Sequence, residues 1–190
     1  MRVYIGRRDK EMEQETDILI DNLRQHQPAA CQKLLAEYGP TVFRTVQRIV
    51  QRYEDAEEVY QDVFVKALRG IDGFNPHQAT LGTWLSRIAY NESLNFMRRQ
   101  KVNIIYMDDR DLGADSLEDV DEAPRDEETI QQLEKALVQL PPQEQAIISM
   151  FYYDEMSLSD IAYVTGSIPS TVATRLFRIR KKLYRIIKTL

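Results

Sequence analysis

Apolar residues recur at three- and four-residue spacing along almost the whole chain, and no convincing strand-like alternation interrupts them. The period breaks at an acidic stretch, residues 103–129, which carries a net charge of −9 and has no helical pattern. The pattern predicts an all-α protein of two small helical domains joined by a flexible acidic linker. A length of 190 residues is enough for two such domains.

We expect the domain boundaries where the helical periodicity and the net charge of the chain change. We expect an N-terminal arm at 1–14, a first domain at 15–102, the linker at 103–128 and a second domain at 129–190. Met12 is an alternative to Met1 as the true start. Within the domains the period predicts helices at residues 17–25, 28–51 with a bend near the Gly-Pro pair at 39–40, 55–71, 83–100, 127–139, 142–152, 158–165 and 169–187.

Composition excludes several classes of protein. The single cysteine, Cys31, cannot form an internal disulfide, and with two histidines there are too few ligands for a four-ligand zinc site. No apolar run spans a bilayer, and the charged start is unlike a signal peptide, so we expect a cytoplasmic protein. A glycine-rich phosphate loop and a catalytic histidine arrangement are also missing, which argues against an enzyme and against a cofactor.

Segment 55–71 combines an apolar core stripe with an acidic outer face. The face holds Glu57, Glu58, Gln61 and Asp62, with Val65 as an exposed apolar contact. Acidic residues in the first turns of a helix complement its dipole, which is the simpler interpretation and the one that spacing favours. The alternative is a docking surface for a basic partner helix.

Segment 83–100 carries a polar stripe beside its own core residues. The stripe consists of Arg87, Asn91, Asn95, Arg98 and Arg99, which fall on one helix face. Amide side chains match base edges and guanidinium groups match phosphate or guanine, so the stripe suits DNA as well as it suits an ordinary solvated face. The preceding polar loop, residues 74–80, includes Asn75 and suits an unstacked base.

The segment 157–176 has the pattern of a helix-turn-helix. Ser157 and Asp160 form a capping pair, Gly166 makes the turn, and Pro169 begins the second helix. The open side of that helix carries polar and basic residues, namely Ser170, Thr171, Thr174, Arg175, Arg178 and Lys182. The first part of such a helix enters the major groove, and later basic residues hold phosphates, so DNA binding is favoured over a purely structural hairpin.

Four blocks together resemble the bacterial sigma factors of the sigma-70 family, in the compact extracytoplasmic-function (ECF) group. The blocks are DAEEVYQDVFVKAL, TWLSRIAYNESLNFMRR, LPPQEQAI and the helix-turn-helix that runs into RIRKKL. The resemblance covers the chain from about residue 17 to its end, in the family's order. Two residues depart from the family's pattern. A basic residue is common where this chain has Ala173, and Pro169 is unusual at the start of the recognition helix.

The resemblance implies a role for each surface. The acidic face, Glu57, Glu58, Gln61, Asp62 and Val65, would bind the β′ clamp helices of core RNA polymerase. The minus-ten element would be bound by Asn75, Arg87, Asn91, Asn95, Arg98 and Arg99. The minus-thirty-five element would be bound by Ser170, Thr171, Thr174, Arg175, Arg178 and Lys182, in a domain that also meets the β flap. An anti-sigma factor is a further expected partner, while a small-molecule substrate is not.

A stand-alone helix-turn-helix transcription regulator is the alternative from another class. A receiver domain of that class would need a strand before its phosphoacceptor aspartate, and the first domain shows none. The linker suits a sigma factor that contacts two promoter elements. Its 26 residues reach roughly 90 Å when extended, and promoter elements one or two helical turns apart lie about 35 to 70 Å from each other. Its acidic charge would repel DNA until polymerase is bound.

Overall fold

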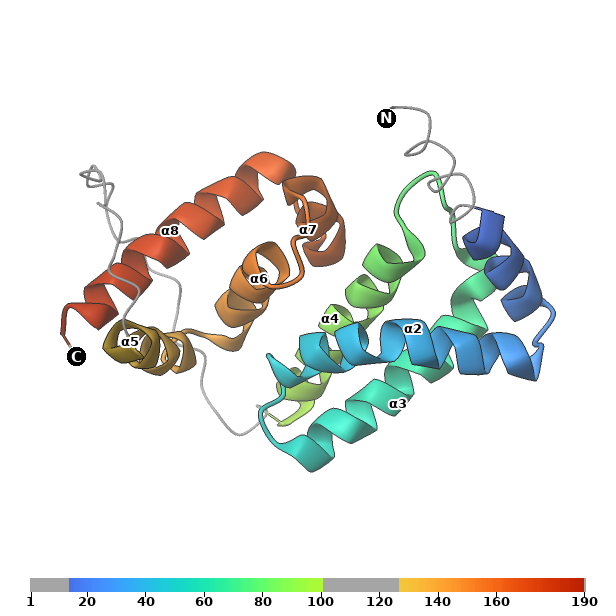
Figure 1. Ribbon diagram of the computed structural model, residues 1–190, viewed down its shortest axis with the longest axis horizontal. Helices are drawn as coiled ribbons and strands as arrows, with labels where there is room; N and C mark the ends of the chain where they lie inside the picture. Colours follow the sequence, from blue (N-terminus) through green and yellow to red (C-terminus); the bar gives the residue numbers. More distant parts are fainter. Residues whose placement is uncertain (1–13, 101–126, 190) are drawn as a thin grey trace.

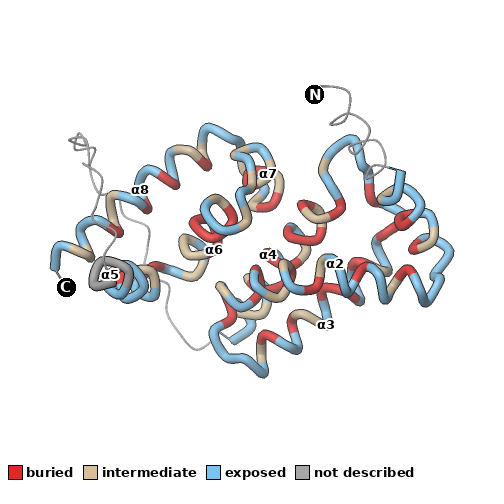
Figure 2. Tube along the Cα trace, in the orientation of Figure 1, coloured by how far each residue is buried: buried red, intermediate tan, exposed pale blue. Residues whose placement is uncertain are grey.

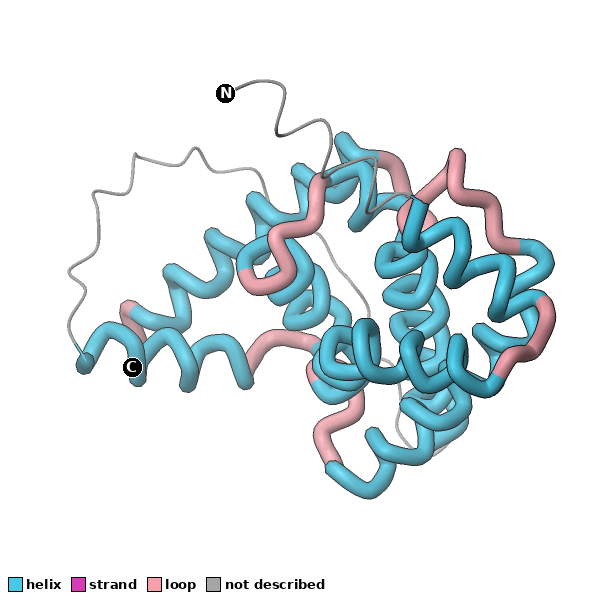
Figure 3. The backbone as a smooth tube through the Cα atoms, turned by 45° about the vertical axis from the view of Figure 1, so that its right-hand side comes forward, coloured by secondary structure: helices cyan, strands magenta, loops and turns pink. Residues whose placement is uncertain are grey.

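A computed structural model describes residues 14–100 and 127–189, and all regular structure in these two ranges is helical (Figures 1 and 3). Residues 14–24 form the first helix. The elements that follow are α2 (Pro28–Gln47), α3 (Tyr53–Gly70), the 3-10 turn η1 (Ile71–Gly73), α4 (Leu81–Gln100), α5 (Glu127–Val138), α6 (Pro142–Tyr152), α7 (Leu158–Thr165) and α8 (Pro169–Ile187). The all-α prediction is confirmed, whereas the predicted arm and linker lie almost wholly outside the described residues.

Helices α6, α7 and α8 begin and end where the sequence predicted, but α2 ends four residues earlier. The prediction that this helix reaches residue 51 was wrong for a physical reason. Ile49 is fully buried in the core of the second domain, while its neighbour Val50 is buried in the core of the first. In a continued helix these two neighbouring side chains would point only about 100° apart. The helix therefore ends before them, and the chain turns so that each side chain enters its own core.

The first domain packs α2, α3 and α4 around one apolar core. Figure 2 shows the buried positions on the sides of these helices that face one another. Phe74, just after η1, is buried and its ring lies 5.2 Å from the Trp84 ring of α4. This contact fixes the loop between η1 and α4 against the helix that follows it.

The second domain packs α5, α6, α7 and α8 around a second core, to which Leu176 and Ile179 of α8 contribute. In Figure 1, α6 and α7 occupy the side of this domain nearest the first domain, and α5 lies farthest away. Helix α7 packs against α4, and α6 contacts α2. The two domains therefore share an interface.

Candidate functional site

Helix α4 presents the predicted minus-ten stripe to solvent. Arg87, Asn91, Asn95, Arg98 and Arg99 are all exposed. Thr80 caps the helix, because its hydroxyl accepts the N–H of Thr83 at 3.1 Å and its carbonyl accepts the N–H of Trp84 at 2.9 Å. The stripe is thus built on a helix whose start is fixed by a side chain.

The opposite sides of α4 are held by packing. Glu92 is buried and forms an ion pair with Lys66 of α3, with 2.5 Å between the charged atoms. Ser93, also buried, donates its hydroxyl to the Ala89 carbonyl at 2.8 Å. With these sides covered, the asparagines of the stripe have a fixed direction.

The loop before α4 is ordered by its own hydrogen bonds. The Asn75 side-chain carbonyl accepts the His77 N–H at 3.0 Å, which forms an Asx-turn. Arg24 donates to the Phe74 carbonyl at 3.3 Å, from the helix at residues 14–24. Asn75 is exposed; its carbonyl oxygen accepts this hydrogen bond within the loop, and its amide nitrogen can donate to a partner.

The helix-turn-helix has the expected local geometry. The Ser157 hydroxyl accepts the N–H of Asp160 at 3.1 Å and so caps α7. Gly166 ends α7 in the left-handed conformation, with φ of +65°, and Pro169 stands in the first turn of α8. Ser157 thus fixes the start of α7, while Gly166 and Pro169 set the path of the chain into α8.

The predicted DNA-binding residues of α8 differ in their exposure and in the hydrogen bonds that they form within the protein. Ser170, Arg175 and Arg178 are exposed, while Thr171 is partly buried. Thr174 is exposed, and its hydroxyl donates to the Ser170 carbonyl at 2.9 Å. Its hydroxyl proton is therefore engaged within the helix.

Lys182 differs from the other predicted contacts because its ammonium group lies 3.0 Å from the Glu144 carboxylate of α6. The pair joins two helices of the second domain, and Lys182 is partly buried. A phosphate contact by Lys182 would compete with this bond.

The acidic face of α3 is exposed at all five predicted positions. Glu57, Glu58, Gln61 and Asp62 lie in solvent, and Val65, which follows them on the helix, is 44% exposed. Glu57 accepts a hydrogen bond from Tyr53, which raises the pKa of the Tyr53 hydroxyl. The face combines negative charge with one apolar contact.

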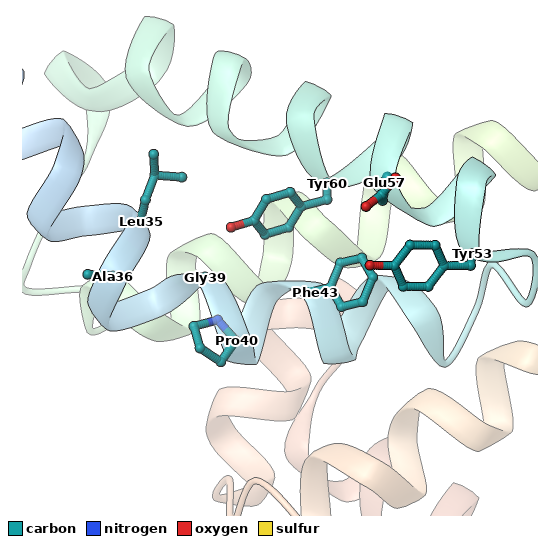
Figure 4. Close-up of a pocket in the computed structure, with 8 residues that line it drawn as sticks. All are labelled: Leu35, Ala36, Gly39, Pro40, Phe43, Tyr53, Glu57 and Tyr60. Carbon is teal, nitrogen blue, oxygen red and sulfur yellow. The ribbon is translucent and has the colours of Figure 1, made fainter.

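An aromatic groove beside this face was not predicted. It lies between α2 and α3 and is lined by Leu35, Ala36, Gly39, Pro40, Phe43, Tyr53, Glu57 and Tyr60 (Figure 4). The Phe43 ring contacts those of Tyr53 and Tyr60 edge to face, each at 5.6 Å. The signal that could have found it is the pair of exposed apolar side chains Leu35 and Tyr53, which no buried stripe accounts for.

The residues that the structure describes hold no cluster of three or more metal-ligating side chains. Among the same residues, no helix is both long enough and apolar enough to cross a membrane.

Comparison with known proteins gives two family matches, one in each domain. Residues 34–102 match sigma-70 region 2, and residues 130–183 match sigma-70 region 4. A curated relative, the ECF RNA polymerase sigma-E factor of Haemophilus influenzae, is 32% identical over 190 residues, covering 94% of this chain and 98% of that protein. ECF RNA polymerase sigma factor SigW of Bacillus subtilis is 27% identical, covering 80% and 86%.

Solved structures share the fold. CnrH in complex with the cytosolic domain of CnrY aligns with a TM-score of 0.65 at 20% identity, covering 92% of this chain and 97% of that one. The sigma factor RpoE in complex with the anti-sigma factor NepR, from Bartonella quintana, aligns with a TM-score of 0.61 at 22% identity, covering 83% and 96%.

Proposed function

Because the chain belongs to the sigma-70 family of RNA polymerase sigma factors, in its ECF group, and directs promoter-specific initiation, we propose that three helix faces divide this work. Helix α3 binds core polymerase, α4 and the loop before it bind the minus-ten element, and α8 binds the minus-thirty-five element. The protein acts by binding, without catalysis of its own, in the cytoplasm where polymerase is found.

The minus-ten assignment rests on the exposed stripe of α4. Asn91 and Asn95 stand one helical turn apart, and amides at that spacing can hydrogen-bond to the edges of successive unstacked bases. Arg98 and Arg99, in the last turn, supply positive charge for the phosphates on either side. The Asx-turn at Asn75 gives the loop a fixed shape next to these bases.

The minus-thirty-five assignment rests on the start of α8. This is the observation that carries the proposal most strongly: a turn through the left-handed Gly166 leads into an exposed helix N-terminus, with Ser170, Thr174, Arg175 and Arg178 on its open side. A helix presented in this way fits the major groove, where Arg pairs with guanine. Residues 171–190 hold seven basic residues and no acid, so phosphate contacts follow along the same helix.

Core polymerase would bind the acidic face of α3. Glu57, Glu58, Gln61 and Asp62 offer a negative surface for a basic helix, and Val65 offers an apolar contact at its C-terminal end. The second domain would meet the β flap. Two weak contacts joined by one chain bind more tightly than either alone, because the second is then intramolecular.

The linker and an anti-sigma factor complete the proposal. The charge of −9 over residues 103–129 would repel DNA in the free protein and occupy a basic channel of polymerase in the complex. Neutralising these acids should strengthen DNA binding without polymerase, and unchanged affinity would contradict the idea.

The solved relative RpoE is bound by an anti-sigma factor, and we propose a partner of that kind for this chain.

Transcription from a promoter library tests the function. Purified bacterial core polymerase is supplied with the library, with and without this protein. Specific initiation only in its presence is the expected result. The stand-alone regulator would instead bind duplex DNA tightly and specifically without polymerase, and that outcome together with no specific initiation would overturn the proposal.

A further inference from the structure

The aromatic groove between α2 and α3 is a feature that the three proposed binding faces leave unexplained. Figure 4 shows the Phe43 and Tyr53 rings and the Glu57 side chain towards one end of it, and Leu35 and Ala36 at the other. Leu35 is 42% exposed and Tyr53 is 54% exposed, so the groove displays apolar surface to solvent. Exposed apolar surface with charge at its rim is typical of a binding site.

Gly39 lets Tyr60 of α3 approach α2 closely. A Cβ added to Gly39 would lie 2.7 Å from the Tyr60 hydroxyl oxygen, so a methyl group there would displace the ring. The Tyr60 ring in turn contacts Phe43 of α2 and Phe64 of α3, both edge to face. The groove therefore depends on a close approach of the two helices at a position without a side chain.

The rim of the groove is acidic on the α3 side. Residues 53–62 hold five acids and no basic residue. One of these acids, Glu57, lines the groove itself, where it accepts a hydrogen bond from Tyr53. A carboxylate beside aromatic rings suits a guanidinium group, which can pair with the charge and stack on a ring. The groove therefore fits a segment that brings arginine together with apolar side chains.

The first residues of the chain have this composition. Residues 1–10, MRVYIGRRDK, hold four basic side chains and one acidic side chain, a net charge of +3. A run of three apolar residues, 3–5, stands just before Arg7 and Arg8. The N-terminal arm is thus complementary to the groove in charge and in apolar character.

The arm joins the described part of the chain close to the groove. The first helix, residues 14–24, begins against α2, because Glu15 and Leu19 line a hollow together with Glu37 of α2. Glu37 is next to Ala36, which lines the groove, so the hollow and the groove lie on neighbouring sides of α2. A helix is about 10 Å across, and the 13 residues before the first helix reach roughly 45 Å when extended. The arm is therefore long enough to enter the groove.

We propose that the N-terminal arm binds in the aromatic groove of the free protein, with the pair Arg7 and Arg8 at Glu57 and the apolar run against Phe43 and Tyr53. Because the arm is part of the same chain, a weak contact is enough to fill the groove when no partner is present. The bound arm covers one edge of the acidic face of α3, so the arm and core polymerase compete. This competition rests on the proposed function, whereas binding of the arm does not.

Disulfide formation tests where the arm lies. In a Cys31→Ser background, Gly6→Cys is combined with Leu35→Cys, at an exposed position of the groove. The control combines Gly6→Cys with Ile18→Cys, which is 61% exposed on the first helix and nearer to residue 6 along the chain. Each rate of intramolecular disulfide formation in the full-length chain is divided by the reactivity of the second thiol toward a small disulfide. The pair at 6 and 35 should close at least about fivefold faster than the control pair.

Equal rates for the two pairs would overturn the inference. A disulfide that joins two chains would also overturn it, because the groove would then belong to a second copy of this protein. Arg7→Gln combined with Arg8→Gln should remove the preference for position 35, and a preference that survives would contradict binding through the arginine pair.

The acidic partner in the groove is tested with a matched pair of variants. Glu57→Gln should reduce the preference for position 35, because it removes the charge that faces the arginines. Glu54→Gln, an exposed acid of the same helix that does not line the groove, should leave the preference unchanged. Equal effects of the two substitutions would contradict the assignment of Glu57.

The affinity for core polymerase tests the competition. Arg7→Gln with Arg8→Gln should raise this affinity about threefold to tenfold, because the groove side of the acidic face is then free. Arg2→Gln with Lys10→Gln, the same charge change elsewhere in the arm, should raise it less. An affinity that the Arg7 and Arg8 substitutions leave unchanged or lower would contradict the competition. Failure of the unmodified chain to bind polymerase would instead contradict the proposed function, while the disulfide rates still report on the arm.

Discussion

The two helices that we propose face DNA, α4 and α8, differ in what fixes their orientation. Helix α8 is aimed by neighbours in sequence: the left-handed Gly166 and Pro169 lie at its start, and the Ser157 cap fixes the start of α7 before it. Helix α4 is aimed by packing, since α2 and α3 cover one side and α7 another. A local change in the turn should therefore redirect α8, whereas α4 should respond to changes in the core of the first domain. The predictions below test that difference and the partner surfaces that depend on it.

The largest effect is expected on the surface of α3, which belongs to neither DNA-facing helix. Asp62→Lys reverses a charge on the acidic face, so association with core polymerase should be lost while the fold is kept, because the side chain is exposed. Co-purification with core polymerase and circular dichroism measure the two properties. Normal association of a folded Asp62→Lys protein would remove α3 from the proposed interface.

A core change should affect one DNA-facing helix and spare the other. Leu176→Ala, at a position 1% exposed in the second core, should lower the stability of that domain by about 2 to 5 kcal/mol. Thermal unfolding followed by hydrogen exchange locates the loss. Protection should fall in α6, α7 and α8 and persist at Leu85 and its neighbours in the first core. An equal fall in both domains would mean that they unfold as one unit.

Substitutions at Arg175 and Lys182 of α8 distinguish a base contact from an ion pair within the protein. Arg175→Ala should weaken binding to a minus-thirty-five site by about 1 to 3 kcal/mol if it contacts a base, and relax the preference at one position. Lys182→Ala should weaken binding less, because this lysine is already paired with Glu144. Affinities of the polymerase complex for a set of single-base variants distinguish them. A loss for Arg175→Ala that is uniform across all sequences would assign Arg175 to phosphate.

Gly166, in the turn before α8, can be compared with Gly73, at the end of η1 in the first domain. Gly166→Ala places a side chain at φ of +65°, which should cost about 1 to 2 kcal/mol. Gly73→Ala, where φ is not positive and no atom lies within 4 Å of an added Cβ, should change stability much less. Denaturant unfolding of the two variants makes the comparison. Equal costs would show that the turn does not depend on the left-handed conformation.

The smallest effect is expected at Asp154, in the domain interface. Burial raises the pKa of its carboxyl, against the opposing charges of Arg44 and Arg48. A raised folded-state pKa means that this group stabilises the fold most when protonated, and that its contribution is lost as pH rises through that pKa. Asp154→Asn should remove this part of the pH dependence and be slightly more stable near neutral pH. An Asn variant with an unchanged pH profile of unfolding would contradict the assignment.

The sequence predicted those parts of the fold that local chemistry decides. The bounds of α6, α7 and α8 agree with prediction because proline and the turn residues Ser157 and Gly166 mark them. The end of α2 was missed because it depends on Ile49 and Val50 entering different cores, which requires knowledge of the tertiary structure.

The candidate binding surfaces were likewise predicted where local sequence decides them and missed where tertiary packing does. Periodicity was enough to predict exposed stripes on α3, α4 and α8, because exposure follows from the position of the core stripe. Periodicity did not reveal that Tyr90 and Leu94 form a second apolar side of α4, or that Arg87 lies over Tyr163. Nor could it find the Lys182–Glu144 pair, whose members are 38 positions apart.

The most direct test of the account is the promoter preference of two variants in the same library transcription assay. Asn91→Ala on α4 should change base preference in the minus-ten element only, and Arg175→Ala on α8 in the minus-thirty-five element only. Preferences that change in the same element for both variants, or in neither, would contradict the division of promoter recognition between the two helices.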